Sequence, residues 1–102
     1  MKLEIYLKKL SELEKLPWTE YRQRAAELQA EYLSGQAIPD AASAIEAIIK
    51  QLPEMPAPTE KECELLELTD EDSPDERWWR CRVGAAIIDV SAESGEVCLM
   101  SV

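Results

Sequence analysis

The 102-residue chain contains no histidine, and its only glycines are Gly35, Gly84 and Gly95. Without histidine there is no Ser-His-Asp or Cys-His nucleophile pair and no imidazole base that titrates near neutral pH. The glycines lie far apart, which excludes a glycine-rich phosphate-binding loop. Carboxylate chemistry remains open, but a carboxylate needs burial or a like-charged neighbour to become a useful acid. We therefore expect that the protein is not an enzyme.

Closely spaced cysteines and long apolar runs are also missing. Cys63, Cys81 and Cys98 lie 18 and 17 residues apart, a pattern typical of neither a zinc site nor a disulfide framework. We expect them to be small, reduced core residues, and we expect no metal or cofactor. No segment approaches the roughly 18 consecutive apolar residues that span a bilayer. The first sixteen residues alternate charge with leucine, unlike a signal peptide, so we expect a cytoplasmic protein.

The order of the residues predicts a single domain over 1–102 in two halves. Residues 1–52 form a helical half, residues 53–59 contain three prolines and form an extended connector, and residues 60–102 form a β meander with an acidic loop at 69–76. The expected fold class is α+β, with three N-terminal helices packed on one face of a small antiparallel sheet of three to four strands.

Apolar residues at three- and four-residue steps predict the three helices. The first covers about 2–15. The second begins near Trp18 or Thr19, with Thr19 as N-cap, and stops at Gly35. The third has Asp40 as N-cap and ends before Pro53. The break at Pro17 makes the first two helices antiparallel neighbours. The expected apolar faces are Leu3, Tyr6, Leu7, Leu10 and Leu13; then Trp18, Tyr21, Ala25, Leu28 and Tyr32; then Ala42, Ile45, Ile48, Ile49 and Leu52.

The leucine face of the first helix has two explanations, packing into the core or a dimer seam, and core packing is favoured. Beyond the connector the period changes to two, which predicts strands at 78–83, 86–90 and 96–102. Gly84 indicates a bulge or tight bend, and Gly95 a hairpin turn. The stretch 62–68 is ambiguous, because Thr59 to Glu62 fits a helical capping box while the following residues alternate like a strand, which we favour.

What the sequence has in abundance is local negative charge. Residues 60–76 carry nine acids and one base, Lys61, so this window holds −8 of the net −10. A concentrated negative field attracts basic partners and repels nucleic acid and anionic membrane. The alternative is a solvated segment that keeps the protein soluble and protects a sheet edge. The acids that we propose as partner-binding residues are Glu60, Glu62, Glu64, Glu67, Asp70, Glu71, Asp72, Asp75 and Glu76.

Two adjacent tryptophans follow this acidic segment. Adjacent residues of a strand face opposite sides, so Trp79 is the core candidate, together with Cys81 and Val83. Trp78 lies with Arg80 and Arg82 on the outer face, either as a partner-binding anchor or covered by arginine stems and helices. The neighbouring −8 makes single-stranded nucleic acid a poor ligand for that face.

The C-terminal stretch has a tryptophan-containing strand, then Ile87-Ile88-Asp89-Val90, then Ser94-Gly95-Glu96-Val97. It resembles the end of small cytoplasmic bacterial immunity proteins and of PepSY-like modules. The resemblance covers at most about 40 residues, and it transfers no functional residue.

From these features we predict a small acidic inhibitor, an immunity protein that occludes a basic toxin through residues 60–76, with Trp78 as anchor. The alternatives are a dimeric secretion chaperone and a phage-type inhibitor that mimics the charge of DNA. The expected partner is a basic protein rather than nucleic acid or membrane, and the sequence allows a monomer or a homodimer.

Overall fold

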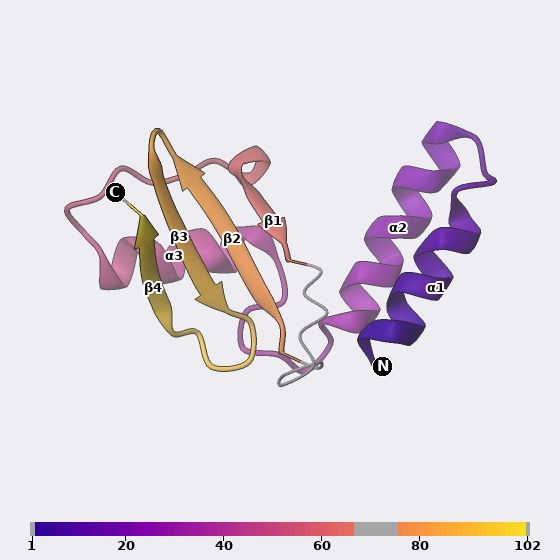
Figure 1. Cartoon of the computed structure of the whole chain (residues 1–102), viewed down its shortest axis with the longest axis horizontal. Coiled ribbons are helices and arrows are strands. Elements are labelled where there is room, and N and C mark those ends of the chain that lie inside the picture. Colours follow the sequence, from indigo (N-terminus) through magenta and orange to yellow (C-terminus); the bar gives the residue numbers. More distant parts are fainter. Residues whose placement is uncertain (1, 67–75, 102) are drawn as a thin grey trace.

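The computed structural model describes residues 2–66 and 76–101, in which three α-helices precede a four-stranded antiparallel sheet (Figure 1). The helices are α1 (Leu3–Leu13), α2 (Trp18–Tyr32) and α3 (Ala41–Gln51), and a 3-10 turn, η1 (Glu60–Glu62), follows them. The strands are β1 (Cys63–Leu65), β2 (Trp78–Val83), β3 (Ala86–Ser91) and β4 (Val97–Ser101), paired in the order β1-β2-β3-β4. The predicted α+β class, with the helices before the sheet, is confirmed.

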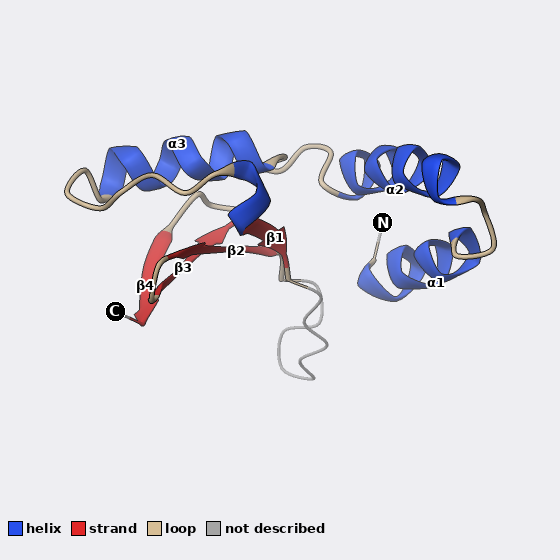
Figure 2. Ribbon diagram, turned by 90° about the horizontal axis from the view of Figure 1, so that it is seen from above, coloured by secondary structure: helices blue, strands red, loops and turns tan. Residues whose placement is uncertain are grey.

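The expected packing of all three helices on one face is wrong for two of them: among the described residues, α3 is the α-helix that lies over a face of the sheet, and the antiparallel α1–α2 hairpin packs beside the sheet on the β1 side (Figure 2). Within the hairpin, Leu3 and Tyr6 are buried, and the Tyr6 ring stacks on Tyr32 with 4.3 Å between the ring centroids. The guanidinium of Arg77, just before β2, lies 4.3 Å from the centroid of the Tyr32 ring and joins the hairpin to the sheet. The apolar face of α1 therefore packs within the chain, as the core interpretation predicts.

The helix α2 starts where predicted, but its N-cap residue differs from the prediction. The helix begins at Trp18 with Pro17 as its N-cap residue, and Thr19 lies inside the helix instead of capping it. Trp18, expected in the core, is 69 % exposed because the first turn of α2 lies at the tip of the hairpin, away from the sheet (Figure 1). Its indole stacks on Tyr21, with 5.7 Å between ring centroids.

The third helix matches its predicted start. Asp40 caps it, and its Oδ1 accepts a hydrogen bond of 2.8 Å from the backbone N–H of Ser43. Ile48 is fully buried against the sheet, whereas Ile49 is 49 % exposed. The helix turns about 100° per residue, so only one of these two neighbours can face the sheet.

The stretch near residue 62 that the sequence left ambiguous contains both a helical turn and a strand, one after the other. The capping box between Thr59 and Glu62 closes the short turn η1, and the chain then enters the strand β1 at Cys63. Gly84 and Ala85 connect β2 to β3 as a two-residue hairpin loop, with φ of +60° at Gly84 alone, the pattern of a type II′ turn. This loop sets the register of the whole β2–β3 ladder.

The core lies between α3 and the inner face of the sheet. Trp79 and Cys81 of β2 are buried there, as the alternation of residues along β2 predicts. Ile88 and Val90 of β3 are buried beside them. The indole N–H of Trp79 donates to the backbone oxygen of Ile38 at 3.0 Å, which fastens the α2–α3 connection to the sheet. Within residues 2–66 and 76–101, no helix combines the length and the apolar character required to cross a membrane.

Candidate functional site

The face of the sheet opposite α3, which we call the outer face, has no helix over it in the described part of the chain (Figure 2). The register places on it the alternate residues of each strand. These are Glu64 of β1, Trp78, Arg80 and Arg82 of β2, Ile87, Asp89 and Ser91 of β3, and Cys98 and Ser101 of β4. Met100 of β4 also lies at this face, where it lines a hollow together with Trp78, Asp89 and Cys98. This face combines charged and apolar side chains on a rigid support, as binding surfaces do.

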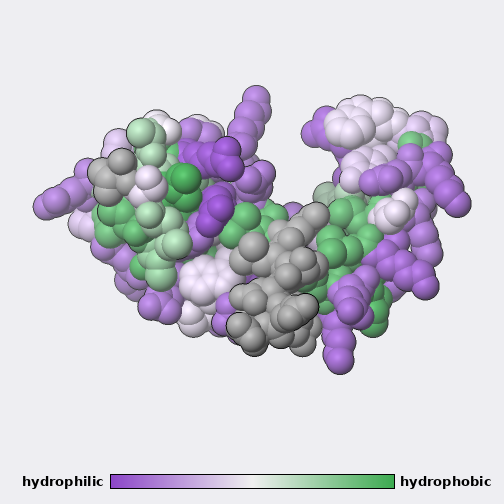
Figure 3. All heavy atoms as spheres, viewed as in Figure 1, coloured by the Kyte–Doolittle hydropathy of each residue, from purple (hydrophilic) through white to green (hydrophobic). Residues whose placement is uncertain are grey.

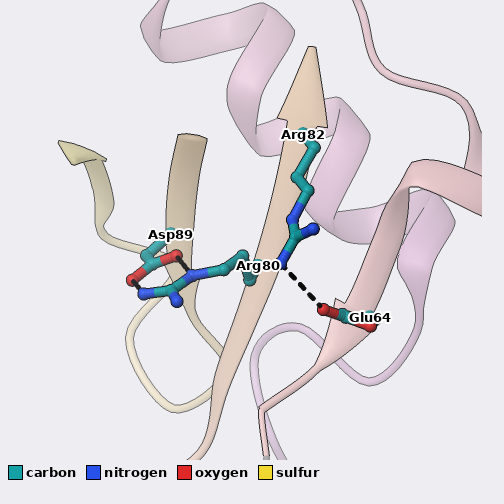
Figure 4. Close-up of polar contacts among 4 residues, drawn as sticks. All are labelled: Glu64, Arg80, Arg82 and Asp89. Carbon is teal, nitrogen blue, oxygen red and sulfur yellow. Dashed lines mark hydrogen bonds and ion pairs between the residues drawn. The ribbon is translucent and has the colours of Figure 1, made fainter. Parts of the chain in front are cut away.

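Two ion pairs occupy the centre of the outer face (Figure 4). The guanidinium of Arg80 donates two hydrogen bonds of 2.9 Å to the Asp89 carboxylate, from Nε to Oδ1 and from Nη2 to Oδ2. The Asp89 side chain is only 9 % exposed, and its bonds raise the pKa of Arg80. Arg82 reaches in the opposite direction, to Glu64 at 3.7 Å, and both of these side chains are 63 % exposed. The four charges cancel, so the centre of the face carries no net charge.

The sequence contains a signal for the Arg80–Asp89 pair that the sequence analysis did not use. A two-residue loop at Gly84 and Ala85 places Val83 opposite Ala86, and counting back along both strands places Arg80 opposite Asp89. Both residues have outward parity in their strands. A two-residue loop, assumed from the sequence, would therefore have predicted the Arg80–Asp89 pair.

An apolar margin lies beside these charges, over β4 (Figure 3). A shallow hollow of about 190 Å³ is lined there by Glu76, Trp78, Asp89, Cys98 and Met100. The half-buried Trp78 donates its indole N–H to Glu76 Oε2 at 3.2 Å, and Met100 is 58 % exposed. Trp78 therefore lies on the outer face as predicted, with part of its surface open.

The structure describes four of the nine predicted acidic residues. Glu60 lies exposed in η1, and Glu62 accepts hydrogen bonds from Thr59, so its carboxylate serves the capping box. Glu64 and Glu76 both lie at the outer face, beside Arg82 and Trp78 respectively. The other five, Glu67, Asp70, Glu71, Asp72 and Asp75, lie outside the described residues, as does most of the predicted 69–76 loop.

The ends of the acidic connection are close together in the fold. The backbone N–H of Leu66 donates to the oxygen of Trp78 at 2.8 Å, so residues 67–75 leave from and return to neighbouring positions of β1 and β2.

The three cysteines occupy two environments. Cys63 and Cys81 face each other across β1 and β2 in the core, and burial raises the pKa of both thiols, so neither is a nucleophile at neutral pH. Cys98 was expected in the core, but it is half-buried on the outer face. In the part of the chain that the structure describes, no group of three or more Cys, Asp or Glu side chains is placed to hold a metal ion.

Comparison of the chain with protein-family models, with curated proteins and with solved structures finds no match. The resemblance of the C-terminal strands to immunity proteins and PepSY-like modules therefore stays a prediction.

Proposed function

We propose that this protein binds and occludes a basic protein, in the manner of an immunity protein, through its outer face and the acidic segment beside it. The observation that supports the proposal most is the position of Trp78. It is a half-buried tryptophan on the uncovered face of a sheet, in contact with Glu76 at the end of a segment carrying a charge of −8. Tryptophan is enriched among the residues that dominate binding energy, and the flanking charge selects a basic partner.

The contacts indicate a different contribution to binding for each group of residues. The neutral Arg80–Asp89 pair holds the strands in place and leaves no uncompensated positive charge at the centre of the face. Trp78 and Met100 supply apolar surface that a partner can desolvate. The acids at the β1 side supply long-range attraction, which raises the association rate and falls as salt is added.

The test compares two triple variants with the same change in net charge. Glu60, Glu64 and Glu76 are replaced by lysine in one variant, and in the other Glu12, Glu46 and Glu54, which lie elsewhere on the surface, are replaced by lysine. Immobilised wild type and both variants are exposed to lysate of the source cell, and bound proteins are eluted by a salt gradient. We expect a basic protein to bind the wild type and the second variant, to elute with salt, and to be lost from the first.

A Trp78→Ala variant separates the apolar contribution from the electrostatic one. We expect it to keep a fast association with that protein but to dissociate about tenfold faster or more, since a central aromatic anchor contributes at least about 1.4 kcal/mol. Equal binding by all variants, or capture that ignores salt, would contradict the proposal and leave the acidic segment as a solubility feature.

A further inference from the structure

The two edges of the sheet are protected to different degrees. At one edge, β1 is three residues long and is preceded by η1, with Glu60, Glu62 and Glu64 along this stretch. At the other edge, β4 is five residues long and contains no charged side chain, and its Leu99 and Met100 are 43 % and 58 % exposed. Natural sheets place charges, prolines or covering elements on their edges because an open edge pairs with another strand. Besides a bulge and the Gln51 side chain of α3, which covers the start of the strand, β4 has little of this protection.

The hydrogen-bond pattern identifies the open main-chain position. In an antiparallel ladder, pairs that exchange main-chain hydrogen bonds alternate with pairs that do not. Ser91 N–H donates to the Glu96 oxygen, so this pair is a bonded one. Two residues further along, Asp89 and Cys98 form the next bonded pair, and Ile88 and Leu99 then form a non-bonded pair. The N–H and C=O of Leu99 therefore point away from β3, out of the sheet. This leaves a donor and an acceptor on one residue in the middle of β4.

The neighbouring positions limit the open stretch. The outward N–H of Val97 already donates to Gln51 Oε1 of α3 at 3.3 Å, and Gln51 Nε2 donates to the Gly95 oxygen at 2.8 Å. A bulge near Met100 disturbs the far end of the strand. Leu99, which directly precedes the bulge, is thus the position of β4 that remains available for pairing.

We propose that β4 pairs antiparallel with β4 of a second copy of this chain, with Leu99 on the two-fold axis. In that register the two Leu99 residues exchange both of their main-chain hydrogen bonds, and Cys98 of one copy lies opposite Met100 of the other. The pairing joins the two sheets into one of eight strands. The strand offers the same donor, acceptor and apolar side chains to itself, which is what an isologous interface requires. This dimer does not depend on the proposed function.

The charge distribution favours a second copy despite a net charge of −10 on each chain. Residues 97–101 are uncharged, and the acids of η1 and β1 lie at the opposite edge of each sheet. In the joined sheet the two β1 strands are about 34 Å apart, from a strand spacing of about 4.8 Å. That distance is several times the Debye length of about 8 Å at physiological ionic strength, so repulsion between the two acidic edges is screened.

The test measures self-association of the full chain by sedimentation equilibrium from micromolar to millimolar concentration, at low and high NaCl. We expect a monomer–dimer equilibrium that is maintained or strengthened by salt, because salt screens the remaining repulsion. A Leu99→Lys variant should weaken the dimer about tenfold or more, since it places a charge on the edge. The matched control is Ile5→Lys, at a residue of α1 that is 48 % exposed, which should dimerise like the wild type.

A second measurement does not depend on a variant that folds. Amide hydrogen exchange of the wild type, followed by NMR, should show the Leu99 N–H becoming protected as concentration rises, while Trp18 in the α1–α2 hairpin stays unchanged. A chain that is monomeric at millimolar concentration would overturn the proposal. Pairing of β4 with a different protein, without any pairing between two copies of this chain, would overturn it too. A dimer broken by Ile5→Lys but not by Leu99→Lys would overturn it as well, because that result places the interface on α1.

Discussion

At the scale of single residues, the Arg80–Asp89 pair is the most constrained contact of the outer face. Both guanidinium–carboxylate distances are 2.9 Å, and the carboxylate is almost fully buried. A buried charge is tolerated because its partner and its hydrogen bonds offset the loss of hydration. The pair is therefore expected to matter for the order of the sheet more than for direct recognition.

This leads to a prediction for a double-mutant cycle. Arg80→Leu leaves the Asp89 carboxylate buried without its counter-ion, and we expect it to lower the free energy of unfolding by about 2–4 kcal/mol. Replacing both residues by leucine removes the unpaired charge, and we expect most of that loss to be recovered. Urea unfolding of the wild type, the two single variants and the double variant measures this. A double variant as unstable as Arg80→Leu alone would contradict the explanation.

At the scale of elements, the start of α3 couples stability to pH. The carboxylate of Asp40 accepts a hydrogen bond from the Ser43 N–H, which lowers the pKa of Asp40 in the folded state. A lowered folded-state pKa means that the cap stabilises above the unfolded pKa of about 3.9 and loses this contribution as pH falls through the folded value.

We therefore expect Asp40→Ala to cost about 1 kcal/mol of stability at neutral pH, and to cost progressively less below about pH 3.9. Asp40→Asn is the control, because asparagine caps almost as well and does not titrate. Unfolding of the three proteins at a series of pH values provides the measurement. A deficit of Asp40→Ala that does not change with pH would show that the charge of the cap is irrelevant.

At the scale of the whole molecule, the α1–α2 hairpin makes the protein elongated. The radius of gyration is 14.1 Å, with extents of 42 × 32 × 24 Å, whereas a compact chain of this length has a radius of about 13 Å. The contact of Arg77 with the Tyr32 ring joins the hairpin to the sheet, and the Arg77 side chain is only 12 % exposed. A desolvated cation–π contact of this kind is worth up to about 2 kcal/mol.

We expect Arg77→Gln to lower the free energy of unfolding by about 1–2 kcal/mol and to speed amide exchange throughout α1 and α2. Arg82→Gln is the matched control, since that side chain is 63 % exposed and its ion pair with Glu64 should contribute less than about 0.5 kcal/mol. Exchange measured on both variants distinguishes them. Equal effects at the two positions would show that the Tyr32 contact does not hold the hairpin.

The sequence by itself determined the local structure of this protein. The spacing of apolar residues located the three helices, Asp40 and the Thr59–Glu62 box marked two starts, and the period of two located the strands after residue 76. Each of these signals acts over a few neighbouring residues, through hydrogen bonds and through the direction of side chains, so it is visible without the fold.

The tertiary structure alone decided the features that depend on which elements contact each other. Periodicity states that a residue belongs to an apolar face, but not whether another element covers that face, which is why Trp18 is exposed and Cys98 lies outside the core. The Arg80–Asp89 pair depends on register, and the open edge at Leu99 depends on strand order. Burial arises from contacts between segments distant in sequence, whose arrangement no local pattern specifies.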